Sequence, residues 1–382
     1  MTTSSTPSSP RVYAVIAGGG TAGHVIPALA LAEHLVDRGR STRSIAFVAS
    51  RRAVDEKLLG DTDHPRLFLS VDGLQRSLAP RAVWRSLLAL PRLVIATAIA
   101  TRRFRLWRPR VVVSVGGFAS EPAVRAARAL RIPVVVVSYD QRPGLATRRQ
   151  AKKAAAVATA FAGSKLPGAK HAGAPVRASI RAVARHGERA ASERAQVAQA
   201  FGIDPTHCIV VAMGGSLGSQ TINHAVQSFV QQNYLRSDIA VLHLAGERFV
   251  NDAIALPEGA GLQYVRRASH AEMHDIWRVA DVVVCRAGAS TLAELVTVGA
   301  PALIVPWKDA ADDHQRLNAR WLEQAGAALV VDETQVGNDF APQLLRLVDD
   351  AALRERVAAK AHALGALNRS SALASIIESV AR

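Results

Sequence analysis

The chain has 382 residues, of which 49% are hydrophobic and 20% are charged. This length fits two domains, and this composition excludes a chain that is disordered throughout. Lys and Arg outnumber Asp and Glu by 47 to 31, a net charge of +16, so the expected partners are anionic: nucleic acid, a membrane surface or phosphorylated substrates. The only cysteines, Cys208 and Cys285, lie far apart in apolar runs, which argues against a disulfide scaffold and a cysteine-built zinc site.

The first segment in chain order, residues 1–10, has the sequence MTTSSTPSSP. It lacks the apolar core of a signal peptide, so it is predicted to be a disordered tail. The longest apolar stretch, residues 86–100, is interrupted by Pro91-Arg92 and is too short to span a bilayer. The sequence therefore predicts a protein of the cytosol.

One pattern recurs along the chain: a short β-branched run ends in glycines and leads into a helical segment. The strand-like runs followed by glycines are residues 12–17, 111–115, 208–212 and 282–285, and the helical segments after them are 28–35, 122–130, 221–230 and 292–298. Further buried runs are residues 45–49, 134–138, 241–244 and 302–305. Continuous apolar strands that alternate with helices are typical of parallel sheets covered on both faces. The sequence therefore predicts an α/β protein with two doubly wound domains, their glycine turns facing a central cleft.

The glycine turns suit a ligand with phosphate groups, because glycine lets the backbone approach an oxyanion and the following helix presents unpaired N–H groups. Residues 18–23 also satisfy the GxGxxG pattern of dinucleotide-binding enzymes. That pattern expects an acidic residue after the next strand, but Ser50-Arg51-Arg52 stands there. An NADP-binding version could use these arginines, yet it leaves the glycine turns of the second half unexplained. Alternatively, a single turn serves only to pack a helix tightly on a strand.

A series of motifs resembles the MurG family of N-acetylglucosaminyltransferases. In chain order they are GGGTAGHVIP at 18–27, VDGL at 71–74, GGFASEP at 116–122, APVR at 174–177, GGSLGS at 214–219, ADVVVCRAG at 280–288, and ADDHQ at 311–315 with Asn318-Ala319. The resemblance covers most of residues 11–330. It implies a GT-B fold of two Rossmann-like domains: an acceptor and membrane-binding domain at 11–175 and a UDP-GlcNAc-binding domain at 176–382, whose last helix can return to the first domain.

The resemblance also implies an activity. GlcNAc would move from UDP-GlcNAc, with inversion, to the MurNAc 4-hydroxyl of lipid I (undecaprenyl-pyrophosphoryl-MurNAc-pentapeptide), giving lipid II for peptidoglycan synthesis without a metal or other cofactor. Two alternatives stay open. One is a related GT-B transferase with another acceptor, and the other is a non-catalytic nucleotide-binding module.

Two residues are implied to be catalytic. His24 follows the first glycine turn and would be the general base for the acceptor hydroxyl, or would orient one. Arg177 would pair with the departing UDP diphosphate. The alternatives are a helix-start histidine bonded to nearby backbone and an ordinary surface arginine.

The residues implied to bind UDP-GlcNAc come from both halves of the chain: Thr21, Ala22, Gly23, Asp140, Arg177, Ser216, His270, Ala289, Ser290, Thr291, Leu292, Ala293, Glu294, His314, Gln315 and Asn318. Glu294 would accept hydrogen bonds from the ribose, and Gln315 would contact the sugar hydroxyls. Ser216 as a helix N-cap and Glu294 near a helix start also need no ligand.

Two positions in this set carry a further question. Asp140 stands where the family has Asn, and its charge is unfavourable near a pyrophosphate unless neighbouring arginines compensate. His270 and His274 have i, i+4 spacing that suits a metal, but no further ligand is evident.

The positive charge is concentrated in the first half. Residues 1–187 carry 30 basic and 9 acidic side chains, a net charge of +21, whereas residues 188–382 have a net charge of −5. Residues 81–110 hold eight arginines and no acid among many apolar side chains. Such a stretch suits an anionic inner-leaflet membrane, and no nucleic-acid-binding module is recognisable. The side chains predicted to face this membrane, from the cytoplasmic side as a peripheral protein, are Trp84, Arg85, Leu87, Leu88, Arg92 and Leu93. The alternative is a helix that packs its apolar side on the domain core.

Overall fold

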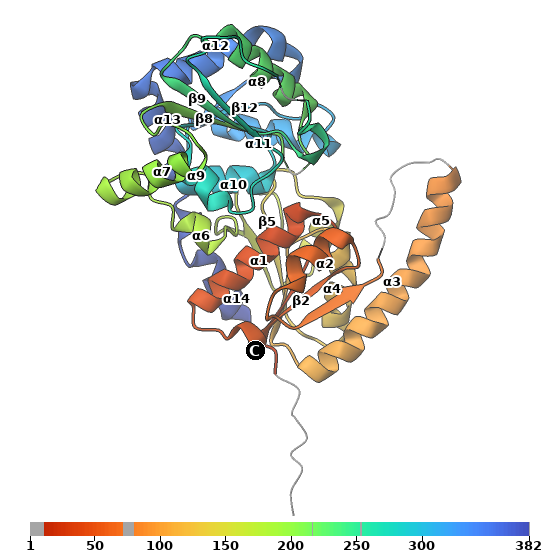
Figure 1. Cartoon of the computed structure of the whole chain (residues 1–382). Helices are drawn as coiled ribbons and strands as arrows, with labels where there is room; N and C mark the ends of the chain where they lie inside the picture. The colour runs from red at the N-terminus through yellow and green to blue at the C-terminus, as the bar shows by residue number, and fades with distance from the viewer. Residues whose placement is uncertain (1–10, 72–79, 216, 253, 382) are drawn as a thin grey trace, which may run out of the picture. The chain divides into compact units, whose positions relative to one another are not determined.

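The computed structural model describes residues 11–71, 80–215, 217–252 and 254–381, and for residues 80–89 the backbone alone. The predicted tail at residues 1–10 lies outside these ranges. The chain forms two compact units (Figure 1). Unit 1 comprises Met1–Tyr139, Pro143–Arg177 and Ser370–Arg382, and unit 2 comprises Asp140–Arg142 and Ala178–Arg369. The main passage between the units, after Arg177, lies two residues beyond the boundary predicted from the sequence.

Unit 1 is built on a parallel sheet with the strand order β3-β2-β1-β4-β5-β6-β7. The strands are β1 (Ala14–Ala17), β2 (Ile45–Ser50), β3 (Arg66–Leu69), β4 (Val111–Ser114), β5 (Val134–Ser138), β6 (Ala156–Thr159) and β7 (Ala169–His171). The helices are α1 (Ala22–Asp37), α2 (Ala53–Gly60), α3 (Pro80–Trp107), α4 (Glu121–Ala129), α5 (Leu145–Ala151) and α14 (Ala372–Val380). Every residue of β1, β2, β4 and β5 is buried, because helices cover both faces of the sheet.

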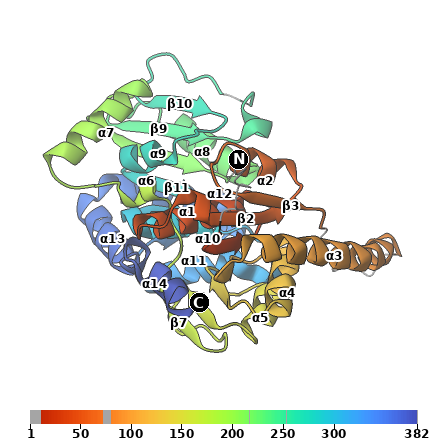
Figure 2. The same ribbon diagram turned by 90° about the horizontal axis from the view of Figure 1, so that it is seen from below.

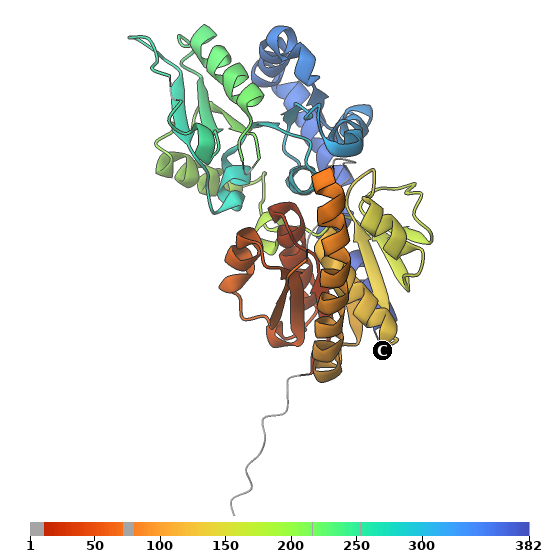
Figure 3. The same cartoon turned by 90° about the vertical axis from the view of Figure 1, so that its right-hand side faces the viewer.

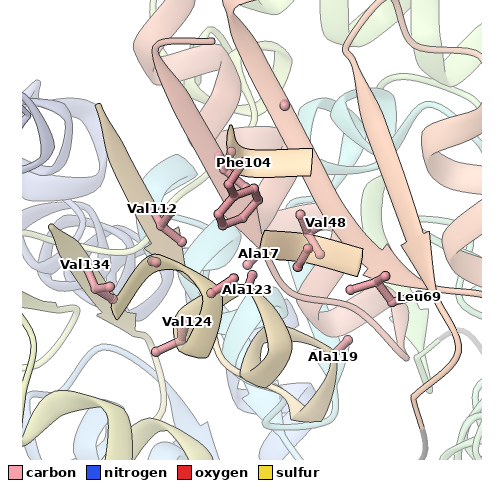
Figure 4. Close-up of a cluster of buried hydrophobic side chains, with 14 of the residues drawn as sticks. Ala17, Val48, Leu69, Phe104, Val112, Ala119, Ala123, Val124 and Val134 are labelled. Atoms are coloured by element: carbon pink, nitrogen blue, oxygen red, sulfur yellow. The ribbon is translucent and has the colours of Figure 1, made fainter. Parts of the chain in front are cut away.

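The core on one face of this sheet lies beneath α3 and α4. Phe104 of α3 and Val124 of α4 pack over Val48 and Val112 of the strands (Figure 4). The C-terminal helix α14 contacts α1, β4 and β6. Its Glu378 accepts hydrogen bonds from Arg38 and Arg40. Residues 370–382 therefore complete unit 1, although they lie at the other end of the chain.

Helix α3 is continuous, and its buried face corrects one sequence prediction. It runs through Pro91 without a break (Figure 3), because burial of one face outweighs the single backbone hydrogen bond that proline removes. Leu93, predicted to face a membrane, is 5% exposed and turns inward with Ala96, Ala100 and Phe104, so that prediction is wrong.

The exposed apolar side chains of the described part of α3 are instead Leu90, Val94, Ile95, Ile99 and Leu106. Arg92 is exposed as expected. The side chains of Trp84, Arg85, Leu87 and Leu88 lie outside the described residues. Neither α3 nor any other helix in the described ranges is long and apolar enough to cross a membrane.

Unit 2 has the parallel strand order β10-β9-β8-β11-β12-β13, which repeats that of unit 1 without its seventh strand. Figure 2 shows β10, β9, β8 and β11 in this order. The strands are β8 (Cys208–Met213), β9 (Ile239–Leu244), β10 (Gln263–Arg267), β11 (Val282–Cys285), β12 (Ala302–Ile304) and β13 (Leu329–Val330). The helices are α6 (Ala178–Arg181), α7 (Glu188–Ala200), α8 (Gln220–Gln232), α9 (Met273–Val279), α10 (Ala289–Val298), α11 (His314–Gln324), α12 (Val336–Asp349) and α13 (Ala351–Leu364). Its core joins the strands to α8 and α12 through Phe229, Phe340 and Leu344.

The eight strands and four helices expected from the sequence are therefore confirmed. In each unit the first strand lies between the second and the fourth, so the winding reverses there: between β1 and β4 in unit 1, and between β8 and β11 in unit 2. Ligands of doubly wound sheets bind at the carboxyl ends of the strands beside this switch point. The loops after these four strands are the ones rich in glycine.

A buried polar chain crosses unit 2 beside this switch point. His243 of β9 has no exposed surface, and its Nε2 and Nδ1 lie 3.0 Å from Asn223 Oδ1 and 2.8 Å from the Tyr264 hydroxyl. Because Asn223 Nδ2 donates to Ala245 O (3.0 Å), its Oδ1 is an acceptor, and His243 must donate from Nε2 and accept at Nδ1. Burial, with a smaller contribution from Arg266, lowers the pKa of His243 to about 3.

We expect this histidine to make stability depend on pH. An unfolded histidine takes up a proton near pH 6.5, whereas folded His243 stays neutral down to about pH 3. Between these values acidification therefore favours the unfolded chain, by about 2 kcal/mol from this residue between pH 7.5 and 5.0. Urea unfolding at pH 7.5 and 5.0 measures the free energy of unfolding at each pH. The decrease in this free energy on acidification should be smaller for His243→Gln than for the wild type. The exposed His224→Gln variant is the control, and an equal loss in all three proteins would contradict the expectation.

Candidate functional site

The first glycine loop, in unit 1, is held by a buried carboxylate. Asp55 of α2 is fully buried and accepts hydrogen bonds from the Gly20 N–H (2.8 Å to Oδ2), the Ser50 N–H (2.9 Å) and the Ser50 hydroxyl (2.6 Å). A Cβ atom at Gly19 would lie 2.3 Å from Asp55 Oδ2, so only glycine fits there. The carboxylate thus takes up the Gly20 N–H, the kind of donor that a phosphate-binding loop offers to its ligand.

This arrangement argues against the dinucleotide alternative. The Gly20 N–H is already bonded to an anionic group, which would repel a pyrophosphate. Arg52, one of the two arginines that an NADP site would need, donates instead to Gly20 O (3.0 Å). Asp55 and Arg52 together fix Gly20 in place, directly before Thr21 and the start of α1.

His24 lies in the first turn of α1, as the sequence predicts. Its Nδ1 is 2.9 Å from the Thr21 hydroxyl oxygen. Its ring lies against the second glycine loop, where a Cβ atom at Gly117 would come within 3.3 Å of the imidazole. The Tyr139 hydroxyl donates to Gly23 O (2.9 Å) and so ties the loop after β5 to the same turn. When Nδ1 carries the proton and donates to Thr21, Nε2 is the basic nitrogen, the arrangement that a general base requires.

In unit 2 an open cavity of about 680 Å³ lies at the carboxyl ends of β8 and β11. Its wall combines four loop glycines, basic and acidic side chains, and two aromatic rings. The lining residues are Gly214, Gly215, Leu217, Gly218, Ser219, Gln220, Thr221, Arg248, Phe249, Arg286, Gly288, Thr291, Trp307, Lys308, Asp309, Gln315 and Glu333. The cavity is where the strand order of unit 2 places a ligand.

The most tightly held charge in this wall is Arg286, which follows β11. Its Nη2 donates to Ser219 Oγ (2.7 Å) and forms an ion pair with Glu333, and its Nη1 donates to Val305 O (3.1 Å). Glu333 also accepts from the Thr221 hydroxyl (2.8 Å) and the Lys308 N–H (2.9 Å). Burial raises the pKa of the Glu333 carboxyl, but the bonds from Lys308, Arg286 and Thr221 outweigh burial, so the pKa lies below its usual value.

Gln315 of α11 presents one end of its amide to the cavity. Its Oε1 accepts from the Ala287 N–H (3.2 Å) and the Trp307 N–H (3.1 Å), so its NH₂ group is the end that can donate to a ligand. Asn318, one turn later, has no exposed surface: its amide donates to Ala287 O (3.2 Å) and accepts from the Gln141 N–H (3.1 Å). Asn318 therefore orders the loops and does not itself reach the cavity.

Comparisons with known proteins agree with this architecture. The glycosyltransferase family 28 N-terminal domain matches residues 14–159, and the family 28 C-terminal domain matches residues 209–376. The chain belongs to the MurG family, within glycosyltransferase family 28.

Curated relatives match over nearly the whole chain. One from Acidothermus cellulolyticus is 34% identical, covering 97% of this chain and 98% of its own, and one from Paenarthrobacter aurescens is 33% identical, covering 99% and 98%. Both are named UDP-N-acetylglucosamine–N-acetylmuramyl-(pentapeptide) pyrophosphoryl-undecaprenol N-acetylglucosamine transferase. The crystal structure of Acinetobacter baumannii MurG has a TM-score of 0.69 at 24% identity, covering 97% of this chain and 99% of that one. The chain has the GT-B fold of two parallel α/β domains.

Of the donor-binding residues implied by the MurG resemblance, Thr291 and Gln315 line the cavity of unit 2. Ser216 lies outside the described residues, and α8 starts at Gln220 with Ser219 as its N-cap, so the helix does not open at Ser216. Leu292 and Ala293 are buried in α10, so neither presents an exposed side chain for ligand contact. Thr21, Ala22 and Gly23 form the turn before His24 in unit 1.

Three of the remaining implied residues have hydrogen-bond partners within the protein. Glu294 Oε2 accepts from the Trp277 indole N–H (2.7 Å), His314 Nδ1 lies 2.7 Å from Ala311 O, and Asp140 Oδ1 accepts from Asn318 Nδ2 (3.4 Å). Ala289 and Ser290 form the first turn of α10. The Nε of Arg177 is buried and has no hydrogen-bond partner among the described residues.

His270 and His274, weighed as a metal pair, both lie beside Asp275, at 3.4 and 3.5 Å. No group of three or more His, Cys, Asp or Glu side chains that could hold a metal ion occurs in the described part of the chain. His270 packs its ring edge against Phe201.

Sequence reasoning missed the residues that give the cavity its charge. Arg286 stands inside a motif that carries the family resemblance, so its position after a buried strand could have marked it. Glu333 comes from the segment after β13, 47 residues further on, and no local pattern links it to Arg286.

Loss of the Asp55 carboxylate is expected to loosen the first glycine loop. Asp55→Ala leaves the Gly20 and Ser50 donors unsatisfied in a buried place, which should lower the free energy of unfolding by about 3 kcal/mol. Urea denaturation measures this effect. Asp63→Ala, at an exposed position just beyond the same helix, is the control. If both variants unfold at the same urea concentration, Asp55 does not hold the loop.

Proposed function

We propose that this chain transfers GlcNAc, with inversion, from UDP-GlcNAc to the MurNAc 4-hydroxyl of lipid I and so produces lipid II for peptidoglycan synthesis. The observation that carries this proposal is the match over at least 97% of the chain to relatives that bear the name of this transferase. The charged cavity at the switch point of unit 2 supports it independently.

We assign the donor nucleotide to unit 2. A diphosphate suits this cavity, whose wall includes Arg248, Arg286 and Lys308, the glycines after β8 and Thr291 in the first turn of α10. The NH₂ group of Gln315 is placed to donate to a sugar hydroxyl. Glu294, oriented by Trp277, would accept from the ribose.

We assign proton removal to His24 of unit 1. The acceptor 4-hydroxyl oxygen attacks the anomeric carbon of GlcNAc while the bond from that carbon to the UDP oxygen breaks. The hydroxyl proton passes to His24 Nε2, and the bonding electron pair leaves with UDP, whose growing charge Arg177 would stabilise. A single displacement of this kind inverts the anomeric centre.

The membrane contact belongs to the same proposal. Val94 and Ile95 of α3 are 66% and 59% exposed, with Leu90 and Ile99 beside them and Arg92, Arg102 and Arg103 flanking them. Exposed apolar side chains bordered by arginines suit the anionic inner leaflet. We therefore propose a peripheral protein on the cytoplasmic face of the membrane, where a lipid-linked acceptor lies.

Asp140 supports a second candidate, a GT-B transferase that uses another acceptor. It stands where the family has Asn, and Asn318 holds its carboxylate. A changed charge at this position is a reason to test the acceptor directly.

Release of UDP from UDP-GlcNAc should require a lipid I analogue. UDP should also raise the thermal midpoint of unfolding, since it binds the folded state alone, whereas NADP should not.

His24→Ala should keep the UDP-induced shift of the thermal midpoint but lose about 100-fold or more in kcat, the usual contribution of a general base. Transfer to a different acceptor, but not to lipid I, would favour the second candidate. UDP binding without transfer to any acceptor would leave a nucleotide-binding module.

Charge placed in the exposed face of α3 should release the protein from membranes. The double variant Ile95→Glu/Ile99→Glu is expected to sediment with phosphatidylglycerol vesicles at least tenfold less than the wild type at low salt. The reason is that two apolar side chains proposed to enter the membrane are replaced by two carboxylates, which the anionic lipid repels. Leu235→Glu, a similarly exposed leucine in unit 2, is the control. Equal sedimentation of all three proteins would argue against α3 as the membrane contact.

A further inference from the structure

Glu333 joins three separate segments of the cavity wall. It is the first residue of the short helix Glu333–Gln335, and its side chain is 8% exposed. It accepts from Thr221 in α8, from the backbone of Lys308 after β12 and from Arg286 after β11. A carboxylate with donors on every side is fixed in one orientation, and it fixes its partners in turn.

The partner that faces the cavity is Arg286. Its side chain is 13% exposed, and the bonds to Ser219, Glu333 and Val305 use three of its five N–H donors, both on Nη2 and one on Nη1. Since Arg286 lines the cavity, the two donors left over are the ones that a ligand can meet. Without Glu333 only the two neutral oxygen acceptors would hold this long side chain, which has many alternative rotamers.

We propose that Glu333 is a positioning residue: it holds the Arg286 guanidinium in the orientation that binds the diphosphate of the nucleotide sugar. This inference rests on the proposed function and adds to it a residue that does not itself touch the substrate. The positioning role and the net charge of the site predict opposite changes in anion affinity when Glu333 is replaced. Removing a carboxylate beside an anion site should tighten anion binding by electrostatics alone, whereas positioning requires that binding weaken.

The test compares two carboxylates of the same cavity. Glu333→Gln keeps the shape but loses the charge, and we expect it to weaken UDP binding about tenfold in calorimetry, with KM for UDP-GlcNAc rising alongside. Asp309→Asn removes an equal charge from the same wall, but no hydrogen bond joins Asp309 to Arg286 in the described structure. It should bind UDP at least as tightly as the wild type. If Glu333→Gln binds UDP as well as or better than the wild type, the proposal is overturned.

A double-mutant cycle separates positioning from general damage. If Glu333 acts through Arg286, Glu333→Gln should weaken UDP binding in the wild type but have no further effect in an Arg286→Ala background. Losses that simply add would overturn the proposal. If Glu333→Gln does not fold, Thr221→Val removes one donor to the same carboxylate and is tested in the same cycle.

The inference and the proposed function can fail separately. Inorganic pyrophosphate reports on the diphosphate contact without the nucleoside, so an unchanged pyrophosphate affinity in Glu333→Gln contradicts the inference alone. A wild-type protein that binds UDP and pyrophosphate but transfers no sugar to lipid I contradicts the proposed function and leaves the role of Glu333 standing.

Discussion

The order of strands in each sheet is the constraint on which the rest of the structure depends. The first strand of each sheet lies in the middle, with the second strand on one side and the fourth on the other. The helical connections on the two sides of the first strand therefore cover opposite faces of the sheet. The loops that leave these strands separate at their carboxyl ends and leave room for a ligand. Glycines after β1, β4 and β8 are then required, because a Cβ atom at Gly18, Gly117 or Gly214 would crowd neighbouring backbone or side chains.

The two units place different ionisable side chains at the same topological position. In unit 1 the Gly20 N–H of the first loop is bonded to the Asp55 carboxylate, and His24 follows that loop in the first turn of α1. In unit 2 an arginine backed by a carboxylate lines the open cavity at that position. One fold thus supplies a candidate site for proton transfer in one unit and a candidate anion site in the other.

Much of this could be predicted from sequence, and the failures have physical causes. The eight predicted strands are buried and β-branched, whereas the strands that were missed are edge strands or rich in small or polar residues: β3, β6, β7, β10 and β13. Leu93 was misplaced because both faces of that part of α3 are apolar, so periodicity could not show which face the core would take. Asp55 and Glu333 act on loops distant in sequence, and such contacts are set by tertiary structure alone.

The passage of the chain between the units has a consequence for synthesis. Unit 2 is inserted into unit 1, since the chain leaves after Arg177 and the last helix, α14, packs back on α1 and β6. On the ribosome, unit 2 can therefore finish folding while unit 1 still exposes the apolar surface that Leu373 and Ile377 later cover. Unit 1 therefore completes its core only when the last helix has emerged.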